Sequence, residues 1–180
     1  MAVPLNRGAR ISVELKLPGI TIGTDDIGAL FKRGVDAGPF LVASRVCGLA
    51  LDTGFTTDNG AGPILWPIHA RRHQLWFLRP TGHAGETLIV SADTGLALDA
   101  TQEAEAGRVL LWEANGAPWQ RWSLQPSPDK AGYLLASVVD GRVLVANDNA
   151  ERGWKPWLSD RDGGWEQQWV LALPHGGTAR

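Results

Sequence analysis

Cysteine is almost missing from this sequence: Cys47 is the single one among 180 residues. One cysteine excludes an intramolecular disulfide and any zinc site built from several cysteines. The sequence also lacks an uninterrupted apolar run of about 18 residues, which a membrane-spanning helix needs. Its N-terminus has no apolar segment of the kind found in secretory signals. We therefore expect a cytoplasmic protein that is not inserted in a membrane, with a signal-independent route of export left open.

Neither sign of charge is in large excess. The formal net charge is −2 at pH 7, which gives no electrostatic reason to expect nucleic acid as a partner. A glycine-rich phosphate loop, a serine nucleophile elbow and a His-Glu-x-x-His helix are all absent from the sequence. We therefore expect no enzyme activity, no cofactor and no nucleic-acid partner.

Tryptophan, by contrast, is abundant. The chain has nine Trp beside one Tyr and four Phe. A packed Trp buries about 150–250 Å² of surface, and its flat ring can also stack against a ligand. The chain has 44% hydrophobic residues, and its 180 residues are enough to fold as one domain with a hydrophobic core. The tryptophans must therefore be divided between core and site.

The tryptophans mark an internal threefold repeat. A Gln-x-Trp motif recurs at a spacing of about 46 residues, as Gln74–Trp76, Gln120–Trp122 and Gln167–Trp169. Each unit also has a Ser-x-x-x-Gly step that leads into an apolar run, followed by a second tryptophan. These second tryptophans are Trp66, Trp112 and Trp157. Landmarks that recur in the same order three times indicate three copies of one structural unit.

The local pattern inside each unit predicts β-structure. Short apolar runs are bounded by Gly, Asp, Asn and Pro, without a helical period. Four runs per unit predict twelve strands, near residues 40–43, 49–51, 64–68 and 75–78, then 88–91, 96–98, 109–112 and 122–124, then 134–137, 143–146, 154–158 and 169–173. Because a propeller needs at least about four blades, three units favour a closed barrel with threefold pseudosymmetry.

The three motifs QLW, QRW and QQW, each with a Gly-x-x-Leu step and a central Trp, resemble those of the ricin-type (ricin B-like) β-trefoil lectin family. The resemblance covers residues 38–174. It implies an all-β fold in which a six-stranded barrel is capped by three hairpins, with one potential sugar pocket per repeat. The repeats would span about residues 38–84, 85–130 and 131–174.

Residues 1–37 and 175–180 lie outside the repeats. Residues 9–17, ARISVELKL, alternate like a strand. We predict an N-terminal arm over residues 1–37, which packs on its own barrel or docks onto another chain, and a C-terminal tail over residues 175–180.

The motif tryptophans are predicted to be structural. One large apolar residue that recurs once per repeat on a strand is what a threefold core layer requires. The resemblance adds that the Gln of each motif bonds to nearby backbone. The predicted structural set is Gln74, Trp76, Gln120, Trp122, Gln167 and Trp169.

The resemblance also implies a pocket in which an aromatic ring stacks on a sugar and an Asp accepts bonds from its hydroxyls. The matching Asp residues are Asp52 and Asp99, whereas the third repeat has Val145. The predicted ligand-binding set is Asp52, Trp66, His69, His73, Asp99, Trp112, Asn115 and Trp119. The alternative is that each Asp caps a turn and each Trp packs under a loop.

Several positions depart from the family pattern. Where the family often has Gln before the stacking aromatic, this chain has Ile64, Leu110 and Lys155. Where the family has a sugar-contacting Asn, the chain has His73, Trp119 and Glu166. These departures weaken the case for the galactose specificity of better-known relatives. His69 and His73 are four residues apart in a loop, but no third ligand is evident nearby, so no metal site is expected.

Two functions are consistent with these residues. The first is a non-catalytic lectin module that binds carbohydrate through up to two pockets, in repeats one and two. The alternative is a protein–protein scaffold or adaptor with degenerate sugar pockets. It would dock into an assembly, or self-associate, through residues 1–37. The extra arm and the lost polar pocket positions motivate the alternative.

Overall fold

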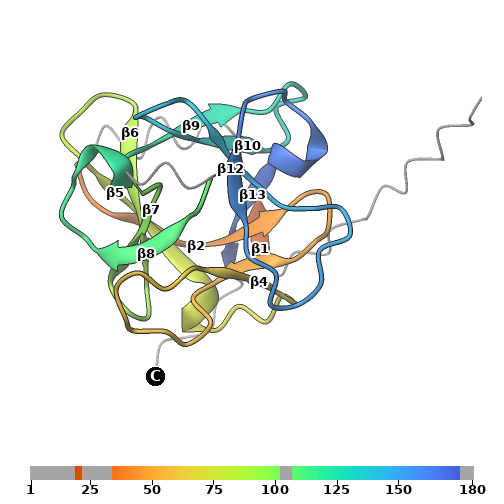
Figure 1. The fold of residues 1–180 in the computed structure, drawn as a ribbon, viewed down its shortest axis with the longest axis horizontal. Helices are drawn as coiled ribbons and strands as arrows, with labels where there is room; N and C mark the ends of the chain where they lie inside the picture. Colours follow the sequence, from red (N-terminus) through yellow and green to blue (C-terminus); the bar gives the residue numbers. More distant parts are fainter. Residues whose placement is uncertain (1–18, 22–33, 102–106, 175–180) are drawn as a thin grey trace, which may run out of the picture.

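The computed structural model describes residues 19–21, 34–101 and 107–174 (Figure 1). Twelve strands make up the three repeats, as the sequence predicts, and every predicted run overlaps one of them. The first repeat has β2 (Ala37–Ser44), β3 (Ala50–Asp52), β4 (Ile64–Trp66) and β5 (Leu75–Pro80). The second has β6 (Glu86–Ser91), β7 (Leu96–Asp99), β8 (Leu110–Glu113) and β9 (Trp122–Pro126). The third has β10 (Tyr133–Ser137), β11 (Val143–Val145), β12 (Trp157–Ser159) and β13 (Trp169–Pro174).

The barrel is a closed ring of six strands. Its antiparallel pairs are β2–β5, β5–β6, β6–β9, β9–β10, β10–β13 and β13–β2. The remaining strands of the repeats form the hairpins β3–β4, β7–β8 and β11–β12 at one end (Figure 1). Closure pairs the strands all the way round, which removes the exposed edges that an open sheet leaves. The architecture is therefore that of a β-trefoil.

The three motif tryptophans fill the barrel, which confirms their predicted role. Trp76, Trp122 and Trp169 are each fully buried. Their indole N–H groups donate to equivalent carbonyls on β3, β7 and β11, at 3.0, 2.9 and 2.9 Å; the acceptors are Leu51, Leu98 and Leu144. Each indole thus links its barrel strand to the hairpin of the same repeat. The threefold repeat of the sequence therefore produces a threefold layer of tryptophans in the core.

A thirteenth strand in the described residues comes from the predicted arm. Strand β1 (Gly19–Thr21) pairs antiparallel with β13, from Gly19 opposite Pro174 to Thr21 opposite Ala172. This part of the arm is therefore held by its own barrel. The arm strand predicted at residues 9–17 and the tail at 175–180 lie outside the described residues, so docking through the arm stays a prediction. No helix in the described residues is long and apolar enough to cross a membrane.

Candidate binding site

A buried glutamine fixes the loop before the Gln-x-Trp motif. Gln74 begins no strand itself but ends the short 3-10 helix η1 (Arg72–Gln74). Its Oε1 accepts hydrogen bonds from the backbone N–H groups of His69 at 2.9 Å and Ala70 at 3.1 Å. Its Nε2 donates to the carbonyl of Pro67 at 3.0 Å. Backbone groups that water would otherwise have to satisfy are thereby paired inside the protein.

The other repeats use the same frame. Gln120 ends η2 (Pro118–Gln120) and Gln167 ends η3 (Trp165–Gln167) in the same way. The backbone donors to their Oε1 atoms are Asn115 and Gly116, and Asp162 and Gly163. This confirms that the three glutamines bond to nearby backbone. It also gives the equivalence of loop positions: His69 corresponds to Asn115 and to Asp162.

The hairpin register corrects one equivalence taken from the sequence. Asp52 pairs with Ile64, Asp99 with Leu110 and Val145 with Trp157. The positions opposite Ala50, Ala97 and Val143 are Trp66, Trp112 and Ser159. Trp157 is therefore not the counterpart of Trp66 and Trp112; Ser159 is. The assignment was wrong because a tryptophan recurs near the expected place, while only cross-strand pairing defines the register.

The third repeat consequently lacks both candidate site residues. Val145 occupies the position of Asp52 and Asp99, and Ser159 occupies the position of Trp66 and Trp112. At these two positions the third repeat has neither a carboxylate nor an indole ring. The combination of an Asp and a Trp on one hairpin therefore occurs at these positions in the first two repeats.

In the first repeat a cavity of about 410 Å³ opens beside the β3–β4 hairpin. It is lined by Asp52, Gly54, Phe55, Ile64, Trp66, His69, Arg71 and His73. Trp66 is half-buried, and Asp52 is only 2% exposed. Asp52 Oδ1 accepts a hydrogen bond from Gly54 N–H at 2.7 Å, so the turn-capping role weighed from the sequence is real. This hydrogen bond occupies Oδ1, whereas Oδ2 lies near the imidazoles of His69 and His73.

Sequence reasoning missed Phe55, which lies at the rim of this cavity. Its side chain is 74% exposed, and its ring centroid is 4.2 Å from that of His73. Its backbone has a φ of +62°, a conformation that costs free energy in a residue other than glycine. No repeat signal identifies it, because it falls in the loop where the repeats differ.

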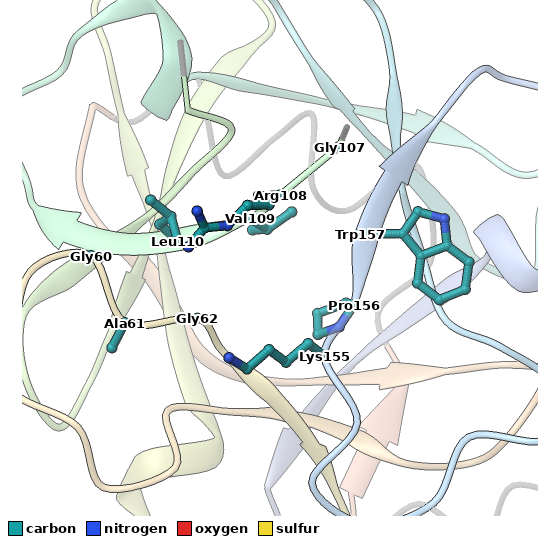
Figure 2. A pocket seen from close by; sticks show the side chains of 10 residues that line it. All are labelled: Gly60, Ala61, Gly62, Gly107, Arg108, Val109, Leu110, Lys155, Pro156 and Trp157. Atoms are coloured by element: carbon teal, nitrogen blue, oxygen red, sulfur yellow. The ribbon is translucent and has the colours of Figure 1, made fainter. Parts of the chain in front are cut away.

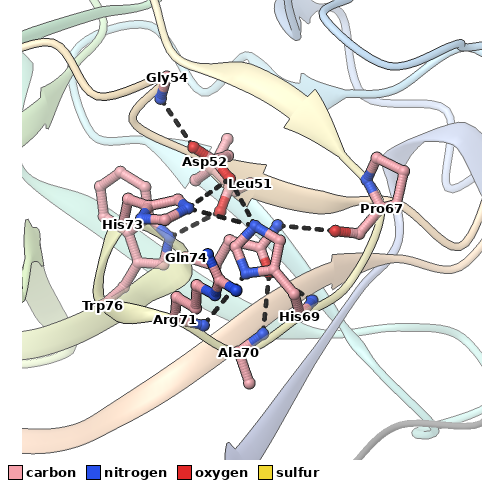
Figure 3. A network of polar contacts seen from close by, with 10 residues as sticks. All are labelled: Leu51, Asp52, Gly54, Pro67, His69, Ala70, Arg71, His73, Gln74 and Trp76. Atoms are coloured by element: carbon pink, nitrogen blue, oxygen red, sulfur yellow. Dashed lines mark hydrogen bonds and ion pairs between the residues drawn. The ribbon is translucent and has the colours of Figure 1, made fainter.

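Two imidazoles face the free oxygen of Asp52. His69 Nε2 lies 3.7 Å and His73 Nε2 lies 3.8 Å from Asp52 Oδ2, and the two ring nitrogens are 3.2 Å apart (Figure 3). Burial, followed by the neighbouring His73, lowers the pKa of His69 below its usual value. The expectation that the two histidines lack a third partner is wrong: the fold brings a carboxylate from β3 to both.

The second repeat has an equivalent Asp and Trp, but both carboxylate oxygens of its Asp accept hydrogen bonds from the protein. Asp99 is 4% exposed; its Oδ1 accepts from Thr101 N–H at 2.8 Å and its Oδ2 accepts from Gln120 Nε2 at 3.1 Å. Trp112 is 41% exposed and packs near Gly60 of the first repeat, where an added Cβ would come within 3.3 Å of the indole. The Trp112 indole is therefore accessible to solvent, and one side of it lies against Gly60.

The two remaining predicted residues of the second repeat lie near η2. Trp119 is half-buried within η2, and its carbonyl accepts from Ala100 N–H at 2.7 Å. Asn115 is exposed, and its Oδ1 accepts from Ala117 N–H at 2.9 Å, which makes it a turn former. The structure thus brings Asp99, Trp112 and the η2 loop to one hairpin, as in the first repeat.

Burial of Asp99 predicts a pH dependence of stability. Desolvation raises the pKa of Asp99 above its usual value, against the hydrogen bonds from Thr101 and Gln120. A raised pKa means that protonation stabilises the folded state. This contribution is fully present below the unfolded-state pKa and is lost as pH rises through the folded-state pKa. The Asp99→Asn variant lacks this titration. The free energy of unfolding of the original protein, relative to that of the variant, should therefore fall as pH rises from about 3 to 6.

Urea unfolding followed by circular dichroism at a series of pH values measures this difference. Asp58→Asn, at an exposed aspartate, controls for the loss of one carboxylate. Parallel stability curves for the original protein and Asp99→Asn would contradict the prediction.

A second cavity lies where loops of all three repeats meet. It has a volume of about 370 Å³ and is lined by Gly60, Ala61, Gly62, Gly107, Arg108, Val109, Leu110, Lys155, Pro156 and Trp157 (Figure 2). These segments precede or begin β4, β8 and β12, so they occupy equivalent places around the pseudo-threefold axis. Trp157, which is not at the stacking position, lines this cavity. Its backbone forms an isolated antiparallel β-bridge with that of Arg108. The threefold repeat of the sequence could have indicated that these loops meet, but not the shape of the cavity between them.

Gln-x-Trp cores, a closed six-stranded barrel and three capping hairpins define a β-trefoil of the lectin type. Residues 72–155 match a family described as "Ricin-type beta-trefoil lectin domain-like". The resemblance indicated by the motifs is therefore confirmed, and the chain has the ricin-type β-trefoil lectin fold. No curated protein matches the sequence of the chain.

Solved structures show the same fold. The designed threefold-symmetric protein ThreeFoil aligns with a TM-score of 0.68 and 28% identity, over 74% of this chain and 96% of that one. A Macrolepiota procera ricin B-like lectin, in complex with lactose, aligns with a TM-score of 0.65 and 16% identity, over 78% and 96%. The C-half of an earthworm R-type lectin, in complex with GalNAc, aligns with a TM-score of 0.57 and 20% identity, over 74% and 96%.

Proposed function

We propose that the chain is a non-catalytic carbohydrate-binding module with two sugar pockets, in repeats one and two. The observation that carries this proposal is the shared register of Asp and Trp. Asp52 and Ile64 are cross-strand partners, and Trp66 is two residues further along β4. Because cross-strand partners share a face of a hairpin and side chains alternate with a period of two, Asp52 and Trp66 lie on one face. The same holds for Asp99 and Trp112.

This pairing supplies the two interactions that a sugar needs. A carboxylate accepts charge-assisted hydrogen bonds from hydroxyl groups, which are stronger than neutral ones. An indole ring packs against the apolar C–H face of a pyranose. In the first pocket the exposed ring of Phe55 offers a second apolar wall. The third repeat, with Val145 and Ser159, supplies neither interaction.

The two pockets lie on different hairpins of one barrel, which favours ligands with several sugars. A single pocket with millimolar affinity contributes only about −4 kcal/mol. Simultaneous use of two pockets raises the apparent affinity by about 10²–10⁴ where the ligand spans both. We therefore propose a branched or repetitive glycan, rather than a free monosaccharide, as the working ligand.

Removing both stacking rings tests the proposal. The double variant Trp66→Ala with Trp112→Ala should weaken glycan binding by about tenfold or more, because about 1.4 kcal/mol of contact free energy is lost with the rings. The double variant Asp52→Ala with Asp99→Ala should do the same through the lost charge-assisted bonds. Binding is measured on a glycan array and then by titration with the best glycan.

The matched control is Trp154→Ala, which removes an indole of comparable exposure, 43% against 41% for Trp112, outside the proposed pockets. Its binding should equal that of the original protein. If no glycan binds the original protein, or if both double variants bind as well as the control, the proposal fails.

A further inference from the structure

The first pocket holds a set of side chains that its counterparts do not. His69 Nε2, His73 Nε2 and Asp52 Oδ2 are separated by 3.2, 3.7 and 3.8 Å, and these three atoms all lie within 4.8 Å of one another. The two distances to the carboxylate are too long for hydrogen bonds. A triangle with these sides has its centre about 2.1 Å from each corner, which is the length of a bond from zinc to imidazole nitrogen or carboxylate oxygen.

We propose that Asp52, His69 and His73 bind a divalent transition-metal ion of the zinc class. Two imidazoles and one carboxylate are the ligand set of zinc sites that keep one coordination position open. The fourth position would face the cavity lined by Phe55 and Trp66, where water or a ligand hydroxyl can complete the coordination. Hard cations such as Mg²⁺ prefer oxygen donors alone, so two nitrogen donors select against them.

The fold holds these three ligands in place. Asp52 ends β3, and its Oδ1 is already bonded to Gly54 N–H, which leaves Oδ2 as the ligand atom. The backbone N–H of His69 is bonded to the buried Gln74. The carbonyl of His73 accepts from Thr53 N–H at 2.9 Å, which ties η1 to the end of β3. Ligands supported by their own hydrogen-bonded backbone form a site before the ion arrives, as metal affinity requires.

Two hydrogen bonds must change when the ion binds. The 3.2 Å contact between His69 Nε2 and His73 Nε2 is a hydrogen bond, and it is lost when both nitrogens bind the ion instead. His69 Nδ1 accepts from Arg71 N–H at 3.2 Å, whereas coordination through Nε2 places the imidazole proton on Nδ1. The bond is long, and Arg71 is exposed, so water can replace it. Arg71 also lines the cavity, and it is exposed to solvent.

The equivalent atoms of the other repeats do not form such a set. In the second repeat Asn115 and Trp119 take the places of the two histidines, and an indole N–H only donates. The Oδ2 atom of Asp99 is bonded to Gln120 Nε2 at 3.1 Å. In the third repeat Val145 replaces the carboxylate. Repeat one therefore diverges from a shared pocket towards metal ligation.

Zinc binding to the chelator-treated full chain, without any sugar, tests the proposal. Calorimetric titration with ZnCl₂ should show one ion per chain with a Kd of about 10 µM or tighter, and MgCl₂ should show no binding at the same concentrations. Asp52→Asn and His69→Gln should each weaken zinc binding by at least about tenfold. Cobalt(II) should give the intense visible bands of a low-symmetry four-coordinate site, and His69→Gln should abolish them.

The matched control is His83→Gln, because His83 is an exposed histidine outside the cluster; it should bind zinc like the original protein. Intrinsic tryptophan fluorescence verifies that each variant is folded. His69 has a side chain that is 28% exposed and lies outside the hydrophobic core clusters, so it can be replaced without opening the core. Absence of zinc binding to the original protein overturns the proposal, as does unchanged binding in a folded Asp52→Asn or His69→Gln variant. Because no sugar is present, the result is independent of the glycan test.

Discussion

Replacing Trp122 by alanine is expected to lower the free energy of unfolding by about 3–5 kcal/mol. The indole is fully buried in the barrel, so its removal leaves a cavity that the closed ring of strands can fill only in part. The Leu98 carbonyl also loses its 2.9 Å hydrogen bond from the indole, and an unpaired buried acceptor adds to the cost. A loss of this size is a large share of the stability of an ordinary domain.

Guanidinium unfolding followed by far-ultraviolet circular dichroism measures this effect without depending on tryptophan fluorescence. Trp122→Phe keeps an apolar ring but removes the N–H group, so its loss should be intermediate. Trp154→Ala, at an exposed tryptophan, should change stability by less than about 0.5 kcal/mol. A loss below about 1 kcal/mol in Trp122→Ala would show that the barrel does not depend on its threefold tryptophan layer.

Replacing Gly107 by alanine is expected to cost about 3 kcal/mol or more, although only one methyl group is added. Gly107 has a φ of +73°, which costs a residue with a Cβ about 1–2 kcal/mol. The new Cβ would lie 2.3 Å from the Leu158 carbonyl oxygen. That overlap is with backbone, which cannot rotate away, and forced overpacking costs a further 1–3 kcal/mol or so. The carbonyl of Gly107 also accepts the Leu158 N–H bond at 2.7 Å, so a shift of this segment would break a link between repeats two and three.

Gly95 provides the matched control for this substitution. Its φ is +74°, and an added Cβ would meet nothing within 4 Å. Gly95→Ala therefore measures the backbone strain alone, and the difference between the two variants measures the close approach of the two repeats. Both are compared by urea unfolding. Equal losses in Gly95→Ala and Gly107→Ala would contradict the tight contact at Leu158.

Much of the fold can be predicted from the sequence because its evidence is local and occurs three times. The Gln-x-Trp motif recurs in each repeat, and Trp76, Trp122 and Trp169 lie where a threefold core places them. The glutamine bonds are likewise the same in each repeat. A consistent pattern over three copies outweighs the uncertainty of each short strand, so all twelve predicted strands overlap observed ones.

The candidate site could be predicted only in part. The pairing of Asp52 with Trp66 and of Asp99 with Trp112 was expected, and the register of β3–β4 and β7–β8 places each pair on one face. Trp157 was misassigned because the loops that join paired strands vary in length, and composition does not define which residues face each other. Phe55 was missed because it belongs to such a loop, without a counterpart in the repeats.

The sequence by itself determined the twelve strands of the repeats, the threefold core and the two repeats that keep an acidic residue beside a tryptophan. Periodicity and motif spacing depend on the order of residues along the chain, so they can be recognised without knowledge of the tertiary structure. Only the tertiary structure decided that Asp52 lies beside His69 and His73, and that loops of three repeats line a second cavity. Those distances depend on how the barrel closes and how each Gln anchors its loop, because residues far apart in the chain approach one another only through those contacts.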